Sequence, residues 1–568
     1  MNRKKKCIFG IHSSYIPMFS KFTYLFLFIV FFSCKPSADN SGLSYLKQTT
    51  NQPKLVVGIV VDQMRYDYLN RFKNKFGSEG FLRLMREGYS CNNHHFNYVP
   101  TYTGPGHASI FTGTTPSVHG IIGNDWYDKV SEATVYCTTD EKYNPVGAAT
   151  KYGHVSPHNL KVTTLADQNR LFTQMNGKTI GVSIKDRGAI FPSGHTANGA
   201  YWFEGLNEGK WMTSTYYRDE LPNWVQEFNS PSNISNYLKT WNPLYDINLY
   251  KESGPDLSNY EKGFIGQSEA VFPYNLKALM EFNGGFDILK TSPFGNEMIT
   301  DFALAAVKAE ALGKDEHTDF LTVSYSSTDY VGHNFGLNSV ELQDMYLRLD
   351  LEIERLLSYL DENIGAGNYT LFLTSDHGAA DVPSYLKDVH MPSGYVQKEL
   401  FTPLYLALNT KYGVSDLIKN ISNNQIFLNQ DQVKELQLNL EAVQNFVVNE
   451  IIHYPAINKA FTATTMQSSY FETGIEKTLQ NGYNQKLSGD ILYTLDSGVI
   501  AYGPKGTTHG SGFTYDTHVP LLFYGNGIQE GKTFERTNVS DIAPTISALL
   551  GIGLPSGATG EVIEKVMY

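Results

Sequence analysis

The feature that most constrains the fold is a set of short apolar runs, rich in β-branched residues, each next to polar residues. They occur in the segments KLVVGIVVDQM, KTIGVSIKDRG, DFLTVSYSSTD, YTLFLTSDHG and VPLLFYG. Runs of this kind are typical of parallel strands that are covered on both faces. Helical patterns lie between them, most clearly over residues 339–361, where large apolar residues recur at three- and four-residue steps. We therefore predict an α/β fold with a doubly wound, mostly parallel sheet flanked by helices.

Two segments interrupt this alternation, at about 200–290 and about 385–505. The first is rich in tyrosine, tryptophan and asparagine. In a doubly wound sheet, ligands bind beyond the carboxyl ends of the strands, so we expect both segments to be inserted caps around such a site. No proline-rich linker, charge run or internal repeat divides the chain, so we predict a single domain over residues 54–568.

The amino-terminal end has the pattern of an export signal. A basic start, MNRKKKC, is followed by the run YLFLFIVFF, which is too short to span a bilayer. We predict a signal peptide over residues 1–33. The junction FFSC resembles that of bacterial lipoproteins, in which Cys34 becomes the lipidated first residue; an ordinary signal peptide with a chance cysteine is the alternative. Residues 34–53 would be a flexible tether, and the protein periplasmic or at the cell surface, anchored by lipid and expected at the outer membrane.

The net charge and the cysteine content argue against two kinds of partner, nucleic acid and a zinc ion bound by thiolates. The formal net charge is -12, and removal of residues 1–33 would take away basic residues and no acid. An acidic chain is a poor partner for nucleic acid, and a local positive site is most simply made by metal ions. Beyond Cys7 and Cys34 only Cys91 and Cys137 remain. They form either one disulfide or two buried thiols, and without a CxxC pair we expect no thiolate zinc site.

A nearly uncharged loop, TYTGPGHASIFTG, contains a candidate nucleophile. Its Gly-Pro-Gly can leave backbone N–H groups free to face an anion, and a helix that starts near HASIFTG would add its positive end. Thr103 in this loop is either a nucleophile or a helix cap.

Acidic and histidine side chains follow the first, third and fourth runs, and two more histidines occur late in the chain. These residues are Asp62, Asp329 with His333, Asp376 with His377, and finally His509 and His518. A four-residue step places a carboxylate and an imidazole on one face of a helical turn. Each alone is weak evidence, since an aspartate at a strand end is most often a helix N-cap. Together, oxygen and nitrogen ligands at three strand ends fit a pair of zinc ions, with His518 ranked below His509.

In this order the motifs VVDQMR, TGPGH, GND, D-x-x-x-H, DHG and THGS resemble the alkaline phosphatase superfamily along nearly all of residues 54–568. The closest likeness is to the phosphate-irrepressible alkaline phosphatases, which are monomeric periplasmic enzymes with a threonine nucleophile and two zinc ions. The resemblance implies that Thr103 is the nucleophile, because it has the family's spacing to His107, whereas Thr101 and Tyr102 do not. It also implies one zinc ion on Asp329, His333 and His509, and a second on Asp62, Asp376, His377 and Thr103.

The charge balance of such a site bears on the substrate. Two zinc ions and three aspartates leave little positive charge for a phosphate monoester dianion, so further donors are needed. Asn124 could donate to one phosphoryl oxygen, and Lys185 and Arg187 are expected on the same side of a strand. By themselves these two would more often be a surface pair with Asp186. Their Lys-x-Arg pattern, however, resembles the monoesterase branch of the superfamily, whereas the nucleotide pyrophosphatase/phosphodiesterase branch lacks it.

We therefore predict an exported phosphomonoesterase with two Zn²⁺ per chain, which hydrolyses small phosphate monoesters through a phospho-threonine and releases inorganic phosphate. A monomer is expected, attached to the membrane only through Cys34. The alternative on the same fold is a phosphodiesterase, nucleotide pyrophosphatase or phosphonate hydrolase. A third hypothesis is a lipoprotein that binds glycans or anions without catalysis. A sulfatase is disfavoured, because neither Cys91 nor Cys137 has the C-x-P-x-R context.

Overall fold

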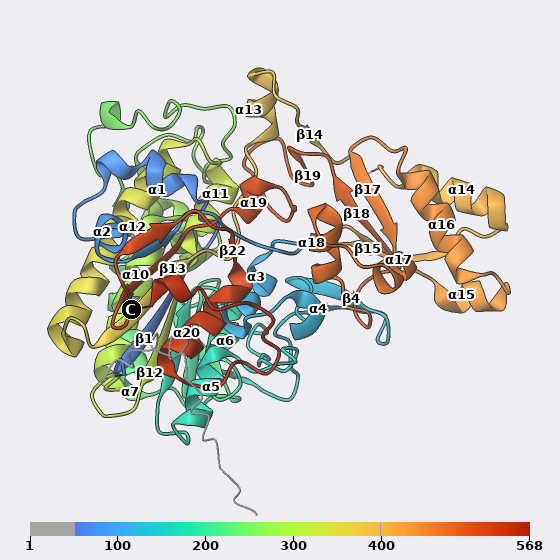
Figure 1. Ribbon diagram of the computed structural model, residues 1–568. Coiled ribbons are helices and arrows are strands. Elements are labelled where there is room, and N and C mark those ends of the chain that lie inside the picture. Colours follow the sequence, from blue (N-terminus) through green and yellow to red (C-terminus); the bar gives the residue numbers. More distant parts are fainter. Residues whose placement is uncertain (1–51, 398, 568) are drawn as a thin grey trace, which may run out of the picture. The chain divides into compact units, whose positions relative to one another are not determined.

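The structure is a computed structural model that describes residues 52–397 and 399–567. The predicted signal peptide, Cys34 and nearly all of the tether lie outside these residues. Among the described helices, none combines the length and apolar character needed to cross a bilayer. The main sheet has ten strands in the order β21-β2-β20-β13-β1-β12-β7-β8-β9-β6. Their bounds in this order are Gly531–Thr533, Tyr89–Cys91, Leu521–Gly525, Tyr369–Thr374, Leu55–Val61, Asp319–Tyr325, Thr179–Ser183, Gly199–Glu204, Lys210–Ser214 and Pro145–Val146. The central strands β13, β1 and β12 are labelled in Figure 1.

The centre of the sheet is parallel and its two sides contain antiparallel pairs. β13, β1, β12, β7 and β8 run in one direction. The prediction that VPLLFYG forms a parallel strand is wrong, because β20 is antiparallel to β13. The register explains this: Leu521 at the start of β20 pairs with Thr374 at the end of β13, so the chain enters β20 at the edge where β13 leaves the sheet.

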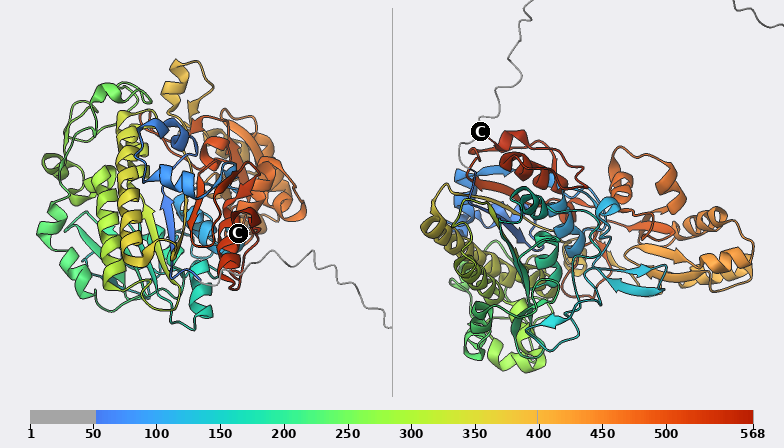
Figure 2. Two further views of the ribbon diagram at one scale, coloured as in Figure 1. Left: turned by 60° about the vertical axis from the view of Figure 1, so that its left-hand side comes forward. Right: turned by 90° about the horizontal axis from the view of Figure 1, so that it is seen from below.

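Helices cover both faces of the sheet, as Figure 2 shows. β1 has a buried residue at every position, and alternate side chains belong to different cores. Val57 and Ile59 pack with helices α10 (Pro293–Ala309) and α12 (Val340–Leu360). Val56 and Val60 pack on the other face with helices α3 (Thr103–Thr112) and α20 (Ile542–Leu550). The predicted helix over 339–361 is α12, and the doubly wound α/β arrangement is confirmed.

The two interrupting segments differ in structure. In the first, β8 and β9 join the main sheet, so its irregular part begins after Ser214. The second builds its own four-stranded sheet in the order β15-β16-β18-β17. These strands are Ile418–Ser422, Gln425–Leu428, Ile491–Leu495 and Ile457–Thr462. Helices α14 (Thr402–Tyr412) and α16 (Leu440–Ile451) complete a separate core with this sheet, drawn in orange in Figure 1.

Candidate active site

The carboxyl ends of three neighbouring strands bring the predicted ligands together. Asp62 directly follows β1, and Asp376 and His377 lie just beyond β13. On the other side of β1, β12 leads into helix α11 (Ser327–Phe335), which contains Asp329 and His333. Because β13, β1 and β12 are adjacent and parallel, their carboxyl ends meet at one edge of the sheet. The first, third and fourth apolar runs thus end at a common site, as their sequence suggests.

Two groups of side chains in this site could hold a metal ion. In the first, Asp329, His333 and His509 offer ligand atoms that all lie within 4.8 Å of one another. In the second, Asp62 and His377 do so together with Asp329, rather than with Asp376. Asp376 is nevertheless close, since its Oδ2 lies 3.6 Å from Nε2 of His377. Asp329 therefore lies between the two groups, and each predicted ligand is at the site.

The burial of the Asp62 and Asp376 carboxylates favours the binding of a cation. Asp62 and Asp376 are both completely buried. Within the described part of the chain, Oδ1 of Asp62 and Oδ2 of Asp376 have no hydrogen-bond donor. Burial raises the pKa of Asp62 to about 6 and that of Asp376 well above its usual value. The other oxygen of Asp62 pairs with Lys185 and that of Asp376 accepts a backbone N–H, so one oxygen of each carboxylate is left without a donor. A buried oxygen of this kind is costly, and metal coordination removes that cost. The oxygen and nitrogen donors here fit zinc-type ligation.

Each predicted histidine ligand is oriented by a backbone carbonyl. Nδ1 of His333 lies 2.7 Å from the Thr507 oxygen, and Nδ1 of His509 lies 2.8 Å from the Thr101 oxygen. His377 is held in the same way, by the oxygen of Gly378 at 2.9 Å. A hydrogen bond at Nδ1 leaves Nε2 of each ring for a metal ion.

The imidazoles differ in their readiness to lose a proton. Burial lowers the pKa of His509 to about 3 and that of His377 well below its usual value, so both rings are neutral. Burial also opposes the charge on His333, but Asp329 outweighs it and raises the pKa of His333. Metal binding at the first group would therefore release a proton from His333.

His518 has a structural position instead. Its ring stacks between Tyr66 and His95, at centroid distances of 4.3 and 4.4 Å. Its Nε2 lies 3.0 Å from the carbonyl oxygen of Asn92. The lower rank given to His518 as a ligand agrees with this placement.

Thr103 is the first residue of helix α3 and faces the metal-ligand cluster. The cap residue is Tyr102, in an extended conformation, so Thr103 is not the helix cap. The Thr103 hydroxyl oxygen lies 3.5 Å from Nε2 of His377 and 3.4 Å from Nζ of Lys185. Thr101 instead donates a hydrogen bond to the Ser511 carbonyl at 2.8 Å. Of these two threonine hydroxyls, that of Thr103 lies next to the predicted ligands and that of Thr101 is bound to a backbone carbonyl.

The glycines around Thr103 allow close packing. A Cβ atom on Gly106 would lie 2.3 Å from the carbonyl oxygen of Asp376, so only glycine fits there. Nδ1 of His107, one turn into the helix, donates a hydrogen bond to the Thr103 carbonyl oxygen at 2.9 Å, and its Nε2 is hydrogen-bonded to the Ser324 hydroxyl at 2.9 Å. These contacts hold the helix start against β12, through Ser324, and against the segment that follows β13, through Asp376.

Lys185 and Arg187 reach the site from a loop and a helix, and not from a strand as predicted. β7 ends at Ser183, Lys185 is the N-cap of helix α6 (Asp186–Ser193), and Arg187 lies in its first turn. The strand ends early because the Ser183 hydroxyl accepts a hydrogen bond from the Lys185 backbone N–H at 3.1 Å. Nζ of Lys185 lies 2.7 Å from Asp62 and 2.6 Å from Asp329.

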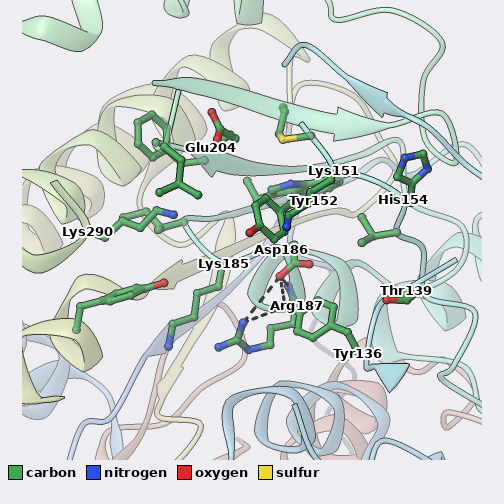
Figure 3. Close-up of a pocket in the computed structure, with 18 of the residues that line it drawn as sticks. Tyr136, Thr139, Lys151, Tyr152, His154, Lys185, Asp186, Arg187, Glu204 and Lys290 are labelled. Atoms are coloured by element: carbon green, nitrogen blue, oxygen red, sulfur yellow. Dashed lines mark hydrogen bonds and ion pairs between the residues drawn. The ribbon is translucent and has the colours of Figure 1, made fainter. Parts of the chain in front are cut away.

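The neighbours of Arg187 and Asn124 leave donors for an anion. Arg187 donates to the Tyr136 hydroxyl at 3.0 Å, and its ion pair with Asp186 is long, 3.9 Å. In Figure 3 the charged ends of Lys185 and Arg187 point to the same side, away from the rest of a cavity of about 470 Å³. The side-chain oxygen of Asn124 accepts a hydrogen bond from the Gly104 N–H at 2.7 Å. The amide nitrogen of Asn124 is not used in this bond and can donate to another group.

Sequence reasoning missed Gln63. Its side-chain amide donates to Asp329 at 2.6 Å, and its backbone N–H donates to Asp376 at 3.1 Å. The residue adopts a φ of 66°, which is uncommon for a side chain of this size. The position directly after Asp62 was the only signal, and it does not reveal that Gln63 orients two predicted ligands.

Comparison with known proteins shows the family to which the chain belongs. The family model for type I phosphodiesterase / nucleotide pyrophosphatase matches residues 56–519. The chain belongs to this family. Alkaline phosphatase PafA of Elizabethkingia meningoseptica is 43% identical over 92% of this chain and 96% of its own. Alkaline phosphatase PhoV of Synechococcus elongatus is also 43% identical, over 92% of this chain and 94% of its own.

The solved structures agree with this assignment. The crystal structure of wild-type PafA matches with a TM-score of 0.88, over 91% of this chain and 99% of that chain. The resemblance to the alkaline phosphatase superfamily and the expected fold class are thereby confirmed. The family member described here is an enzyme of the alkaline phosphatase type, so the hypothesis of a binding lipoprotein without catalysis is set aside.

Proposed function

We propose that this enzyme is an exported phosphomonoesterase that uses two zinc ions and a phospho-threonine intermediate. The observation that carries the proposal is the position of Lys185. Its ammonium group is buried between Asp62 and Asp329 and lies 3.4 Å from the Thr103 hydroxyl. A second cation, Arg187, lies two residues further on in the first turn of α6, so two donors are available for a phosphoryl group with two negative charges. The two relatives at 43% identity, both named alkaline phosphatases, support the same activity.

The proposed ligand sets are the two predicted from the sequence. Asp329, His333 and His509 would hold one ion, and Asp62, Asp376 and His377 the other with Thr103. Zinc bound by these residues supplies a Lewis acid, which lowers the pKa of the Thr103 hydroxyl and offsets charge on the phosphoryl oxygens. The orphaned oxygens of Asp62 and Asp376 and the neutral rings of His377 and His509 support these sets.

The chain's own groups then position the reaction. Thr103 gives up its hydroxyl proton and attacks phosphorus in line, which forms the Thr103–phosphate bond and breaks the bond to the leaving oxygen, and that oxygen takes up a proton. Lys185, Arg187 and Asn124 donate hydrogen bonds to the non-bridging oxygens and fix the ester for attack. Attack by water on the phospho-threonine then releases inorganic phosphate and restores the threonine.

A phosphodiesterase is the second candidate. The name of the family model favours it, because that family is described by phosphodiesterase and pyrophosphatase activity. Lys185 and Arg187 argue for the monoesterase, since a diester has one negative charge fewer to match them.

Beyond the catalytic domain at 54–568, we propose the predicted signal peptide, the lipid anchor at Cys34 and a monomeric, outer-membrane enzyme without a nucleic-acid partner. The net charge of -12 supports the last point. Cys91 and Cys137 are free and buried in the structure, so of the two alternatives left open by the sequence, the structure has two thiols.

One experiment separates the two activities. The purified zinc-loaded enzyme is assayed with an aryl phosphate and with the matching aryl methyl phosphate diester, which share a leaving group. The proposal expects a higher kcat/KM for the monoester. A higher kcat/KM for the diester would overturn it in favour of the second candidate.

A further inference from the structure

A groove beside the first group of predicted ligands has no assigned role. It has a volume of about 580 Å³, and its lining includes Lys262, Tyr330, His333 and Tyr502. The side chain of His333 is 26% exposed, whereas those of Asp329 and His509 are 4% and 6% exposed. His333 therefore connects the groove to a cluster that is otherwise buried.

The expected direction of bond breaking leads into this groove. Thr103 lies next to His377, which belongs to the second group of ligands. In an in-line displacement the leaving oxygen lies opposite the attacking oxygen. The leaving oxygen would therefore be on the side of Asp329, His333 and His509, and the rest of the leaving group would extend past His333 into the groove.

A lysine is fixed at the wall of the groove by Tyr502. The Tyr502 ring stacks on His333 with centroids 5.8 Å apart, and its hydroxyl donates to the His333 carbonyl at 3.1 Å. Lys262 donates to the Tyr502 hydroxyl at 2.6 Å, and its Nζ lies 3.8 Å from the centre of that ring. Lys262 is thus held one aromatic ring away from a predicted metal ligand.

The charge of Lys262 is not balanced by a neighbouring acid. Among the described residues, no carboxylate forms an ion pair with it. The residue is exposed at the wall of the groove, and desolvation on its protein side lowers the pKa of its ammonium group. Asp287, the acid in the groove lining, is already paired with Lys290 at 2.6 Å. In a chain with a net charge of -12, an unpaired cation at this place points to an anionic ligand.

We infer that the groove is the leaving-group subsite and that Lys262 favours phosphate monoesters whose leaving group carries a second negative charge. A carboxylate or a further phosphate on the leaving group has the required chemistry. The inference rests on the proposed function, because it takes its direction from in-line attack by Thr103. Lys262 acts on specificity and not on the chemical step.

Binding of two phosphonates that cannot be hydrolysed tests the inference without relying on turnover. Isothermal titration calorimetry measures the Kd of benzylphosphonate and of 4-carboxybenzylphosphonate for the zinc-loaded enzyme. The variants are Lys262→Gln, Lys262→Arg and, as a matched control, Lys308→Gln, an exposed lysine on α10. We expect the native enzyme to bind the carboxylated ligand about 3- to 10-fold more tightly, as befits a partly exposed ion pair.

The variants give the decisive comparison. Lys262→Gln should abolish the preference, whereas Lys262→Arg and Lys308→Gln should keep it, and added salt should weaken it in the native enzyme. The ratio of kcat/KM for 4-carboxyphenyl phosphate to phenyl phosphate should change in parallel. If Lys262→Gln weakens both phosphonates equally, Lys262 only supports Tyr502 and the inference is wrong.

The outcomes that would refute the proposed function differ from those that would refute only the inference about Lys262. If the native zinc-loaded enzyme binds neither phosphonate and hydrolyses neither aryl phosphate, the phosphomonoesterase proposal fails, and the inference fails with it. If it hydrolyses phenyl phosphate but shows no preference for the carboxylated ligand, the inference alone fails. Thermal unfolding of each variant shows whether the substitution has left the fold intact.

Discussion

Simultaneous replacement of Lys185 and Arg187 by alanine should convert the enzyme's preference from monoesters toward diesters. The side chain of Lys185 is 3% exposed and that of Arg187 is 18% exposed, so water screens neither charge well. A charge-assisted hydrogen bond in such a place contributes about 1.5–3 kcal/mol. Two of them contribute about 3–6 kcal/mol, which is about two to four powers of ten in kcat/KM for the monoester.

The diester should lose much less. It carries one negative charge fewer, and an alkyl group occupies the place of one oxygen that these residues would contact. We therefore expect a loss of about one contact, or about one to two powers of ten, for the diester. The assay compares kcat/KM for an aryl phosphate and the matching aryl methyl phosphate, in the native enzyme and in the double variant.

Two controls make this comparison interpretable. Lys185 also pairs with Asp62 and Asp329, so the zinc content of every variant must be measured alongside its activity. Lys290→Ala is a matched variant, because this lysine lines the same cavity as Lys185 but pairs with Asp287 instead. It should leave the ratio of the two activities unchanged. Equal losses of the two activities in the double variant, at normal zinc content, would refute the charge-matching argument.

Three further predictions follow from the site. Thr103→Ala should lower kcat by several orders of magnitude at nearly normal zinc content, whereas Thr103→Ser should lower kcat far less because the oxygen remains. Substantial activity in the alanine variant would exclude Thr103 as the nucleophile. Elemental analysis after dialysis should find about two zinc ions per chain. A chelator should abolish activity and zinc should restore it, whereas one ion per chain, or mainly calcium, would contradict the assignment. Asn423→Ala should lower kcat/KM about 3- to 10-fold, because Asn423 donates a hydrogen bond to the Asp125 carbonyl at 2.6 Å and so holds the loop that contains Asn124. An unchanged kcat/KM would show that this contact is dispensable.

The sequence predicted the site best where local pattern and sheet topology coincide. An aspartate after an apolar run is at a strand end whatever the tertiary structure, and a four-residue step from Asp329 to His333 stays on one helix face. Once the three runs are adjacent parallel strands, their ends must meet, so Asp62, Asp329 and Asp376 could be grouped before the fold was known.

The features that the sequence did not reveal depend on contacts between distant segments. The direction of β20 depends on where the long second insertion returns to the sheet, and no periodicity records that. The backbone N–H of Lys185 donates to the Ser183 hydroxyl instead of continuing the strand, which an apolar run followed by charges does not indicate. Gln63 orients two aspartates through its unusual φ, and a glutamine in the sequence gives no sign of this.

Lys185 connects metal binding to substrate recognition. Its ammonium group lies at 2.7 and 2.6 Å from carboxylate oxygens of Asp62 and Asp329, the two aspartates that take part in the second candidate metal group. A lysine and a metal ion compete for the same oxygens, because both offset the same negative charge. If a metal ion bound these oxygens, the ammonium group would lose its partners but would remain buried and next to Thr103. A buried cation needs an anion, and the phosphoryl oxygens of a monoester bound beside Thr103 provide one. The same competition explains why the loop around Thr103 contains no charged side chain. An acidic side chain there would pair with Lys185 in place of the substrate. A basic side chain would pair with the aspartates in place of the metal ions.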